Sequence, residues 1–147
     1  MKTLVILGTS REESNTLSAI TQLCPFSDYE LIDLQTIKLN HYDYDRQTDV
    51  ADDFQMIAQK MLVADNIIFA TPVYWYAMSG RLKMFFDRLT ELLFNHKAIG
   101  KGLKGKKTYL IATGSDPELP EGFEVPFRKT SEYFEMHYEQ AFYLAAK

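Results

Sequence analysis

The chain has 147 residues, of which 46% are hydrophobic and 24% charged, a composition typical of a globular domain rather than a disordered segment. Its formal net charge of −4 argues against a nucleic-acid-binding surface, which would need a basic stripe. No apolar run approaches the length of a membrane span, and a strand-like run begins so close to the N-terminus that we expect no signal peptide. We therefore expect a single domain, residues 1–147, that contacts neither nucleic acid nor membrane.

The sequence contains one cysteine, Cys24, so neither an internal disulfide nor a multi-cysteine metal site can form. Cys24 precedes Pro25 at the expected end of a helix, where a packed thiol is a better interpretation than a nucleophile. A reduced, cytoplasmic setting fits this cysteine usage best.

A polar loop, residues 8–16, follows the first predicted strand, residues 3–7. The strand is apolar and partly β-branched, as expected for a central parallel strand covered on both faces. Apolar residues then recur at helical spacing from Leu17 to Leu23, so the loop opens a helix. We expect Gly8 to let the backbone turn sharply off the strand.

This loop offers more polar donors than helix capping needs. The alternative to an anion-binding loop is simple N-capping of the helix, which requires only one such residue. An anion at a helix N-terminus is held by free N–H groups, by the helix dipole and by neighbouring hydroxyl groups. The loop lacks the motifs of nucleoside-triphosphate and dinucleotide loops, so it favours a phosphate ester other than a triphosphate. The candidate anion-binding residues are Thr9, Ser10, Arg11, Ser14, Asn15 and Thr16.

Residues 30–34 are predicted to form a second strand, and residues 50–64 a helix. Between them lies a polar, tyrosine-rich loop that carries Asp43, Asp45 and Arg46. We interpret these carboxylates as solvated, because the loop has no glycine to supply the turn of a calcium site.

An aromatic turn within residues 71–80 follows the third predicted strand, residues 66–70, and leads into a long amphipathic helix over residues 78–93. Ligands bind at the carboxyl ends of the strands in open α/β sheets. Aromatic side chains there suit a flat, partly apolar ligand, although packing at a core edge is the commoner role of Tyr and Trp. The candidate binding residues of this turn are Pro72, Val73, Tyr74, Trp75 and Tyr76.

The last third of the chain continues the alternation of strands and helices. Residues 97–107 carry five lysines and three glycines, and we interpret them as a solvated surface turn. The fourth strand, residues 109–113, ends in small polar residues that extend the candidate site, namely Thr113, Gly114 and Ser115. A helix over residues 125–135 and a fifth strand over residues 137–144 follow.

Five alternating strands imply an α/β fold in which a parallel sheet carries helices on both faces. A phosphate loop after the first strand favours the doubly wound, flavodoxin-like order 2-1-3-4-5, in three α/β/α layers, with FMN at the junction of strands one and three. In that order the two candidate loops become neighbours.

With these residues in view, the chain resembles the flavodoxin-like NADPH-dependent FMN reductase and multimeric flavodoxin family over most of its length. The similarity is strongest in residues 8–16, 64–65 and 71–88. The last segment contains Thr-Pro-Val-Tyr-Trp, Ser-Gly-Arg-Leu-Lys and Phe-Asp-Arg in fixed order, a signature far more specific than a lone glycine pattern.

The resemblance implies an FMN-dependent NAD(P)H oxidoreductase. Family members reduce flavins, quinones, azo or nitro compounds, or metals, and most are dimers or tetramers, so we expect a small-molecule acceptor and a homodimer or higher homo-oligomer. By position, the residues that would hold the FMN phosphate are Ser10, Arg11, Ser14, Asn15 and Thr16. Those that would border the isoalloxazine ring and ribityl chain are Pro72, Val73, Tyr74 and Trp75. Those that would touch the polar edge of the ring are Thr113, Gly114 and Ser115.

The chain departs from the family pattern in two places. Some relatives carry cysteines for an iron–sulfur cluster or redox pair ahead of the second helix, but residues 41–53 contain none, so we expect no cluster. The sequence also stops soon after the fifth predicted strand, where relatives add a helix, and we expect a partner subunit to cover the apolar surface left open.

Two other functions remain open at this stage. A flavodoxin-type electron carrier would bind FMN without reacting with NAD(P)H, although a net charge of −4 is weak acidity for that role. A flavin-free domain would use the same fold for protein contacts or regulation.

Overall fold

The sheet of this protein has five parallel strands in the order β2-β1-β3-β4-β5, as predicted. The structure, a computed structural model, describes residues 1–11, 14–45 and 51–146. The strands are β1 (Thr3–Leu7), β2 (Glu30–Asp33), β3 (Asn66–Pro72), β4 (Lys107–Gly114) and β5 (His137–Ala145). The helices are α1 (Asn15–Leu23), η1 (Leu34–Thr36), α2 (Phe54–Val63), α3 (Gly80–Arg88), α4 (Glu91–Phe94), α5 (Lys97–Gly102) and α6 (Val125–Tyr133).

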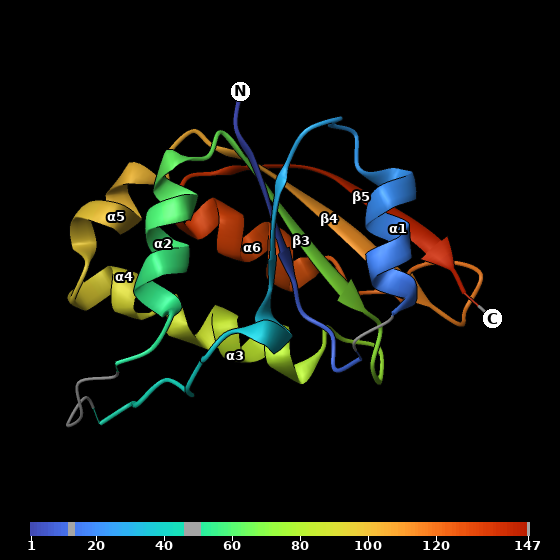
Figure 1. Ribbon diagram of the computed structural model, residues 1–147, viewed down its shortest axis with the longest axis horizontal. Coiled ribbons are helices and arrows are strands. Elements are labelled where there is room, and N and C mark those ends of the chain that lie inside the picture. The colour runs from blue at the N-terminus through green and yellow to red at the C-terminus, as the bar shows by residue number, and fades with distance from the viewer. Residues whose placement is uncertain (12–13, 46–50, 147) are drawn as a thin grey trace.

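Side chains of the central strands alternate between two apolar layers, as the period of two in a strand requires. In β1, Leu4 and Ile6 face one layer, whereas Val5 and Leu7 face the other. Residues of α2 to α6 cover the first layer, and α1 covers the second. Figure 1 shows α1 standing apart from α2, α4 and α5. The expected placement of helices on both faces is confirmed.

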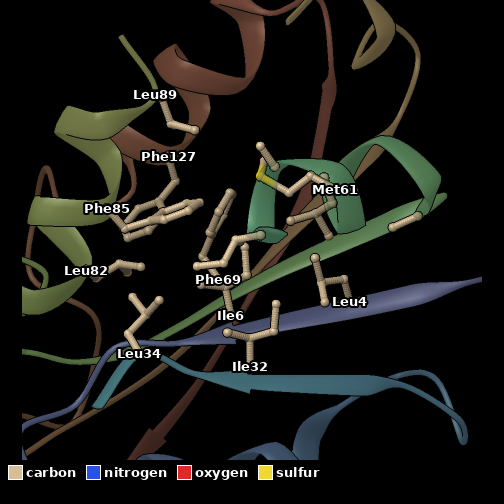
Figure 2. Close-up of a cluster of buried hydrophobic side chains, with 14 of the residues drawn as sticks. Leu4, Ile6, Ile32, Leu34, Met61, Phe69, Leu82, Phe85, Leu89 and Phe127 are labelled. Atoms are coloured by element: carbon tan, nitrogen blue, oxygen red, sulfur yellow. The ribbon is translucent and has the colours of Figure 1, made fainter. Parts of the chain in front are cut away.

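The larger layer is centred on the aromatic side chain of Phe69 in β3. Its ring centroid lies 4.9 Å from that of Phe86 in α3 and 6.1 Å from that of Phe127 in α6. Figure 2 shows side chains from α2, α3 and α6 closing over Ile6 and Phe69. This packing fixes α3, and therefore the loop before it, against the sheet.

The long helix expected over residues 78–93 is two helices, α3 and α4. The Thr90 hydroxyl donates to the carbonyl oxygen of Asp87 at 2.7 Å, and Leu89 N–H donates to the carbonyl oxygen of Phe86 rather than one residue further back. These short-range bonds tighten the chain and end α3. Amphipathic spacing continues across the break, so periodicity alone did not reveal it.

Residues 97–102, expected as part of a solvated turn, form helix α5. Ile99 and Leu103 are buried one helical turn apart, while Lys97 and Lys101 are exposed. Gly100 lies so close to α4 that an added Cβ would be 2.5 Å from the Leu92 carbonyl oxygen. The prediction was wrong because glycine lowers helix propensity, whereas here a glycine is needed for packing.

The start of one further helix differs from the prediction. Helix α2 begins at Phe54 rather than at residue 50, and the Asp52 carboxylate accepts the Phe54 N–H at 3.1 Å. Arg46 and residue 50 lie outside the described residues.

Candidate functional site

The loops after β1 and β3 meet at the carboxyl edge of the sheet, on opposite sides of one buried serine. Ser79, whose residue is 0% exposed, donates its hydroxyl hydrogen to the Gly8 carbonyl oxygen at 2.7 Å. The Ser79 hydroxyl oxygen also accepts the Leu82 N–H at 3.1 Å and so caps α3. The Ser79 N–H in turn donates to the Thr71 hydroxyl at 2.9 Å. One side chain thus ties the two predicted loops together.

Gly8 is required by close packing, not by the sharp turn that we expected. Among the described glycines, the left-handed backbone region is occupied by Gly105 and Gly122, and Gly8 does not adopt it. A Cβ on Gly8 would lie 2.6 Å from the Cβ of Leu82 and 3.0 Å from its backbone N and Cα. Helix α3 therefore approaches the end of β1 more closely than any side chain would permit.

A cavity of about 260 Å³ opens where these loops meet the end of β4. It brings together most of the predicted site, and its lining is Thr9, Arg11, Ser14, Asn15, Thr16, Pro72, Val73, Tyr74, Thr113, Gly114, Ser115 and Ala146. Ser10 lies outside this lining, and its carbonyl oxygen accepts a hydrogen bond from the Gln35 side chain at 3.4 Å. Ala146 follows β5, and nothing in the sequence indicated that it would line the site.

The end of the cavity nearest α1 is rich in hydrogen-bond donors. Ser14 caps α1 by accepting the Leu17 N–H at 3.0 Å, which confirms the capping interpretation for this residue. Capping by Ser14 leaves the N–H groups of Asn15 and Thr16, in the first turn, without intrahelical acceptors. A nine-residue helix directs its positive dipole end at this point. The geometry suits an anion.

Two buried hydroxyl groups meet at the floor of the same cavity. The Thr16 and Thr113 side-chain oxygens are 2.7 Å apart, and the two residues are 1% and 3% exposed. This pair links the start of α1 to the end of β4. The expectation that Thr113 touches the polar edge of a planar ring stays a prediction, and its hydroxyl group contacts Thr16 in the first turn of α1.

The aromatic turn after β3 presents its rings to solvent. Tyr74 and Ala77 exchange two backbone hydrogen bonds, of 2.9 and 3.1 Å, across Trp75 and Tyr76. Trp75 and Tyr76 have φ angles of 50° and 66°, values that favour glycine or asparagine and that cost on the order of 1 kcal/mol each for other residues. They are 92% and 66% exposed, so the core-edge interpretation is wrong for both.

A second cavity, of about 190 Å³, adjoins the first and shares Val73, Gly114 and Ser115 with it. Its further lining is Trp75, Tyr76, Asp116 and Tyr143. The Tyr143 hydroxyl donates to the Asp116 carbonyl oxygen at 2.6 Å and fixes the loop after β4. Burial, together with the nearby Asp116 carboxylate, raises the pKa of Tyr143. Sequence reasoning missed Asp116 and Tyr143, because β5 meets this loop only in the folded sheet.

The acidic loop after β2 carries Asp43 and Asp45 in the part that the structure describes. The Asp43 carboxylate accepts the Asp45 N–H at 3.0 Å, which is a local turn contact. In residues 1–11, 14–45 and 51–146, no group of three or more His, Cys, Asp or Glu side chains is placed to hold a metal ion. Over the same ranges, no helix has both the length and the apolar character needed to cross a bilayer.

Residues 1–126 match the family model for NADPH-dependent FMN reductase. The chain belongs to this family. YwqN of Bacillus subtilis, named as an NAD(P)H-dependent FMN-containing oxidoreductase, is 33% identical over 123 residues, which cover 79% of this chain and 68% of YwqN. The family identification confirms the resemblance that the two loop motifs indicated.

Solved structures support the fold. The Trp repressor binding protein from Bacillus subtilis superimposes with a TM-score of 0.79 at 27% identity, over 99% of this chain and 85% of that protein. The general stress protein 14 from Treponema denticola, solved in complex with FMN, gives a TM-score of 0.68 at 21% identity, over 99% of this chain and 87% of that one. The flavodoxin-like fold class is therefore confirmed.

Proposed function

We propose that this protein is an FMN-dependent NAD(P)H oxidoreductase that passes electrons from a nicotinamide, through bound FMN, to a small acceptor such as a quinone or a flavin. The observation that carries the proposal is the convergence of an anion-binding helix start and an aromatic turn on adjoining cavities at one sheet edge. Membership of the FMN reductase family supports it.

The residues of the site fit FMN in three respects. The helix start and the hydroxyl groups beside it suit the phosphate, which would be held by Ser14, Asn15 and Thr16 with Thr9, Ser10 and Arg11 nearby. The two cavities share walls, so an elongated ligand can extend from one into the other. Only together do they reach the volume of a cofactor site. Gly114 lines both cavities and leaves no room there for a side chain, because a Cβ would lie 2.8 Å from the Tyr143 hydroxyl oxygen.

FMN, when bound, supplies the hydride and electron chemistry, and the protein supplies position and electrostatics. The N–H groups of Val73 and Tyr74 already donate to the carbonyl oxygens of Thr113 and Ala77. Within the described residues, the N–H groups of Trp75 and Tyr76 have no such acceptor and are left for a ligand. The rings of Tyr74 and Trp75 would control access for a flat nicotinamide or quinone.

A visible spectrum of the purified protein tests this function. We expect flavin absorption after incubation with FMN and gel filtration, and bleaching of that absorption when NADPH or NADH is added without oxygen. Bound flavin that neither nicotinamide bleaches would indicate an electron carrier instead. A protein that retains no FMN would indicate a flavin-free interaction domain.

Replacing Ser14 and Asn15 together with alanine is expected to weaken FMN binding at least tenfold and riboflavin binding less than twofold. Hydrogen bonds to a charged group contribute about 1.5–3 kcal/mol, and riboflavin lacks the phosphate. Fluorescence titration with both flavins measures the two dissociation constants.

Ser18→Ala with Thr21→Ala, two exposed positions on the same helix outside the cavity lining, is the matched control. It should change neither constant. Equal losses of FMN and riboflavin in the double variant of Ser14 and Asn15 would show the phosphate assignment to be wrong.

We also propose that the protein is a cytoplasmic homodimer or higher homo-oligomer with a small-molecule acceptor. Phe142 and Leu144 of β5 are only partly buried at the margin of the α1 layer, and Val125 and Tyr133 of α6 are 40% and 68% exposed. Such apolar surface favours a second subunit. Light scattering gives the mass in solution, and a strict monomer would contradict the proposal.

A further inference from the structure

We infer that Thr113 is a positioning residue for the anionic end of the ligand, and that it acts through Thr16 rather than on a planar ring. The inference rests on the proposed binding of FMN. Its basis is the 2.7 Å contact between the two hydroxyl oxygens, which joins residues 97 positions apart in the sequence.

Each hydroxyl group has one hydrogen and two lone pairs, so a pair of them uses one hydrogen and leaves the other available. Both threonines are buried and both line the cavity. Among the described residues, neither hydroxyl group forms a further hydrogen bond. One hydroxyl hydrogen is therefore free to donate to a ligand.

A bound anion determines which of the two hydroxyl groups donates to the ligand. Thr16 lies in the first turn of α1, where the helix dipole and the free N–H groups attract negative charge. The favoured arrangement has Thr113 donating to Thr16, and Thr16 donating to the anion. A chain of this kind strengthens the outer bond, because each donor polarises the next. Thr113 then orients the Thr16 hydroxyl group and raises its strength as a donor.

Strand β4, which carries Thr113, also contributes to a second buried hydroxyl pair, and this pair serves as an internal comparison. Thr108 of β4 and Ser131 of α6 have side-chain oxygens 2.8 Å apart, and they are 0% and 1% exposed. Neither residue lines the two cavities of the site. A loss of stability from breaking a buried hydroxyl pair is therefore separable from a loss of ligand orientation.

The test measures FMN and riboflavin dissociation constants for Thr113→Val, Thr113→Ser and Thr108→Val. Valine keeps the shape of threonine without its hydroxyl group. We expect Thr113→Val to weaken FMN binding about three- to tenfold, the effect of one net hydrogen bond, and riboflavin binding less than twofold. Thr113→Ser should restore FMN binding, and Thr108→Val should leave both constants unchanged despite a lower unfolding temperature.

A Thr16→Val background completes the test. In that background Thr113→Val should no longer affect FMN binding, because the residue through which it acts has lost its hydroxyl group. Equal weakening of FMN and riboflavin by Thr113→Val, or additive effects of the two valines, would overturn the inference while the proposed function stands. A wild-type protein that binds neither flavin overturns the proposed function and this inference with it.

Discussion

Asp52→Asn is expected to lower the free energy of unfolding by about 3 kcal/mol, because it removes the main counter-charge of a buried guanidinium group. The side chains of Arg88 and Asp52 are 2% and 1% exposed. Arg88 Nη1 donates to Asp52 Oδ2 at 2.5 Å, and Nη2 donates to Oδ1 at 3.1 Å. Arg88 Nε also donates to the Glu91 carboxylate at 2.6 Å, so the variant keeps one charged partner.

The pair joins three segments that are distant in the sequence. Arg88 ends α3 and donates to the Asn40 carbonyl oxygen at 2.9 Å, while Asp52 accepts the Asn40 N–H at 2.8 Å. The guanidinium carbon of Arg88 lies 4.8 Å from the ring centroid of Phe54, at the start of α2. Loss of the carboxylate charge therefore loosens α2, α3 and the chain before α2 together.

The pH dependence of stability provides a second readout for this variant. Burial raises the pKa of Asp52, but hydrogen bonds from Arg88 and from the N–H groups of Asn40 and Phe54 outweigh it, so the pKa lies below its usual value. Because the folded-state pKa is depressed, the carboxylate stabilises the protein fully above the unfolded-state pKa, about 4. That stabilisation is lost as the pH falls further, through the folded-state pKa.

Urea unfolding of wild type and Asp52→Asn at pH 7 and near pH 3 measures both effects. The stability difference between the two proteins should be largest at pH 7 and should narrow on acidification. Asp87→Asn is the matched control, because Asp87 pairs with the exposed Lys83 on the surface of α3 and should change stability by less than about 0.5 kcal/mol. A pH-independent difference, or a loss of under 1 kcal/mol in Asp52→Asn, would contradict the role given to this pair.

The strands could be predicted because local sequence marks them, and their order because a phosphate loop was expected after the first strand. Apolar runs such as residues 3–7 and 66–70 mark buried parallel strands, and strand–helix alternation fixes the handedness of the crossovers. The hydroxyl-rich loop and the aromatic turn each follow one of these strands, so the order of the sheet alone brings them together. Most of the cavity lining follows from those two facts.

The remaining features depend on contacts between distant segments. Helix α5 exists because Gly100 packs against α4, whereas its own propensity is low. Tyr143 reaches the site from β5 by register, and Trp75 adopts a left-handed conformation that its residue type disfavours. The partner of Thr113 is 97 residues away. No local pattern carries this information.

Gly8→Ala is expected to lower the free energy of unfolding by about 2 kcal/mol and to weaken FMN binding more than tenfold. The added Cβ would meet the Leu82 Cβ at 2.6 Å and the Leu82 backbone at 3.0 Å. Backbone cannot rotate away as a flexible side chain can, so α3 must shift, and overpacking of this kind costs about 1–3 kcal/mol. The shift also stretches the hydrogen bond from Ser79 to the Gly8 carbonyl oxygen, which holds the two loops of the site together.

Gly80→Ala separates this clash from any general effect of replacing a glycine near α3. Gly80 is the first residue of that helix, and a Cβ there would meet no atom within 4 Å. Alanine should therefore be neutral or stabilise the protein by up to about 1 kcal/mol, and FMN binding should be unchanged. Thermal unfolding and FMN titration of both variants decide the matter. If Gly8→Ala had the unfolding temperature and the FMN affinity of the wild type, the prediction would be wrong. The close approach of α3 to β1 would then not be what holds the anion-binding loop and the aromatic turn in place.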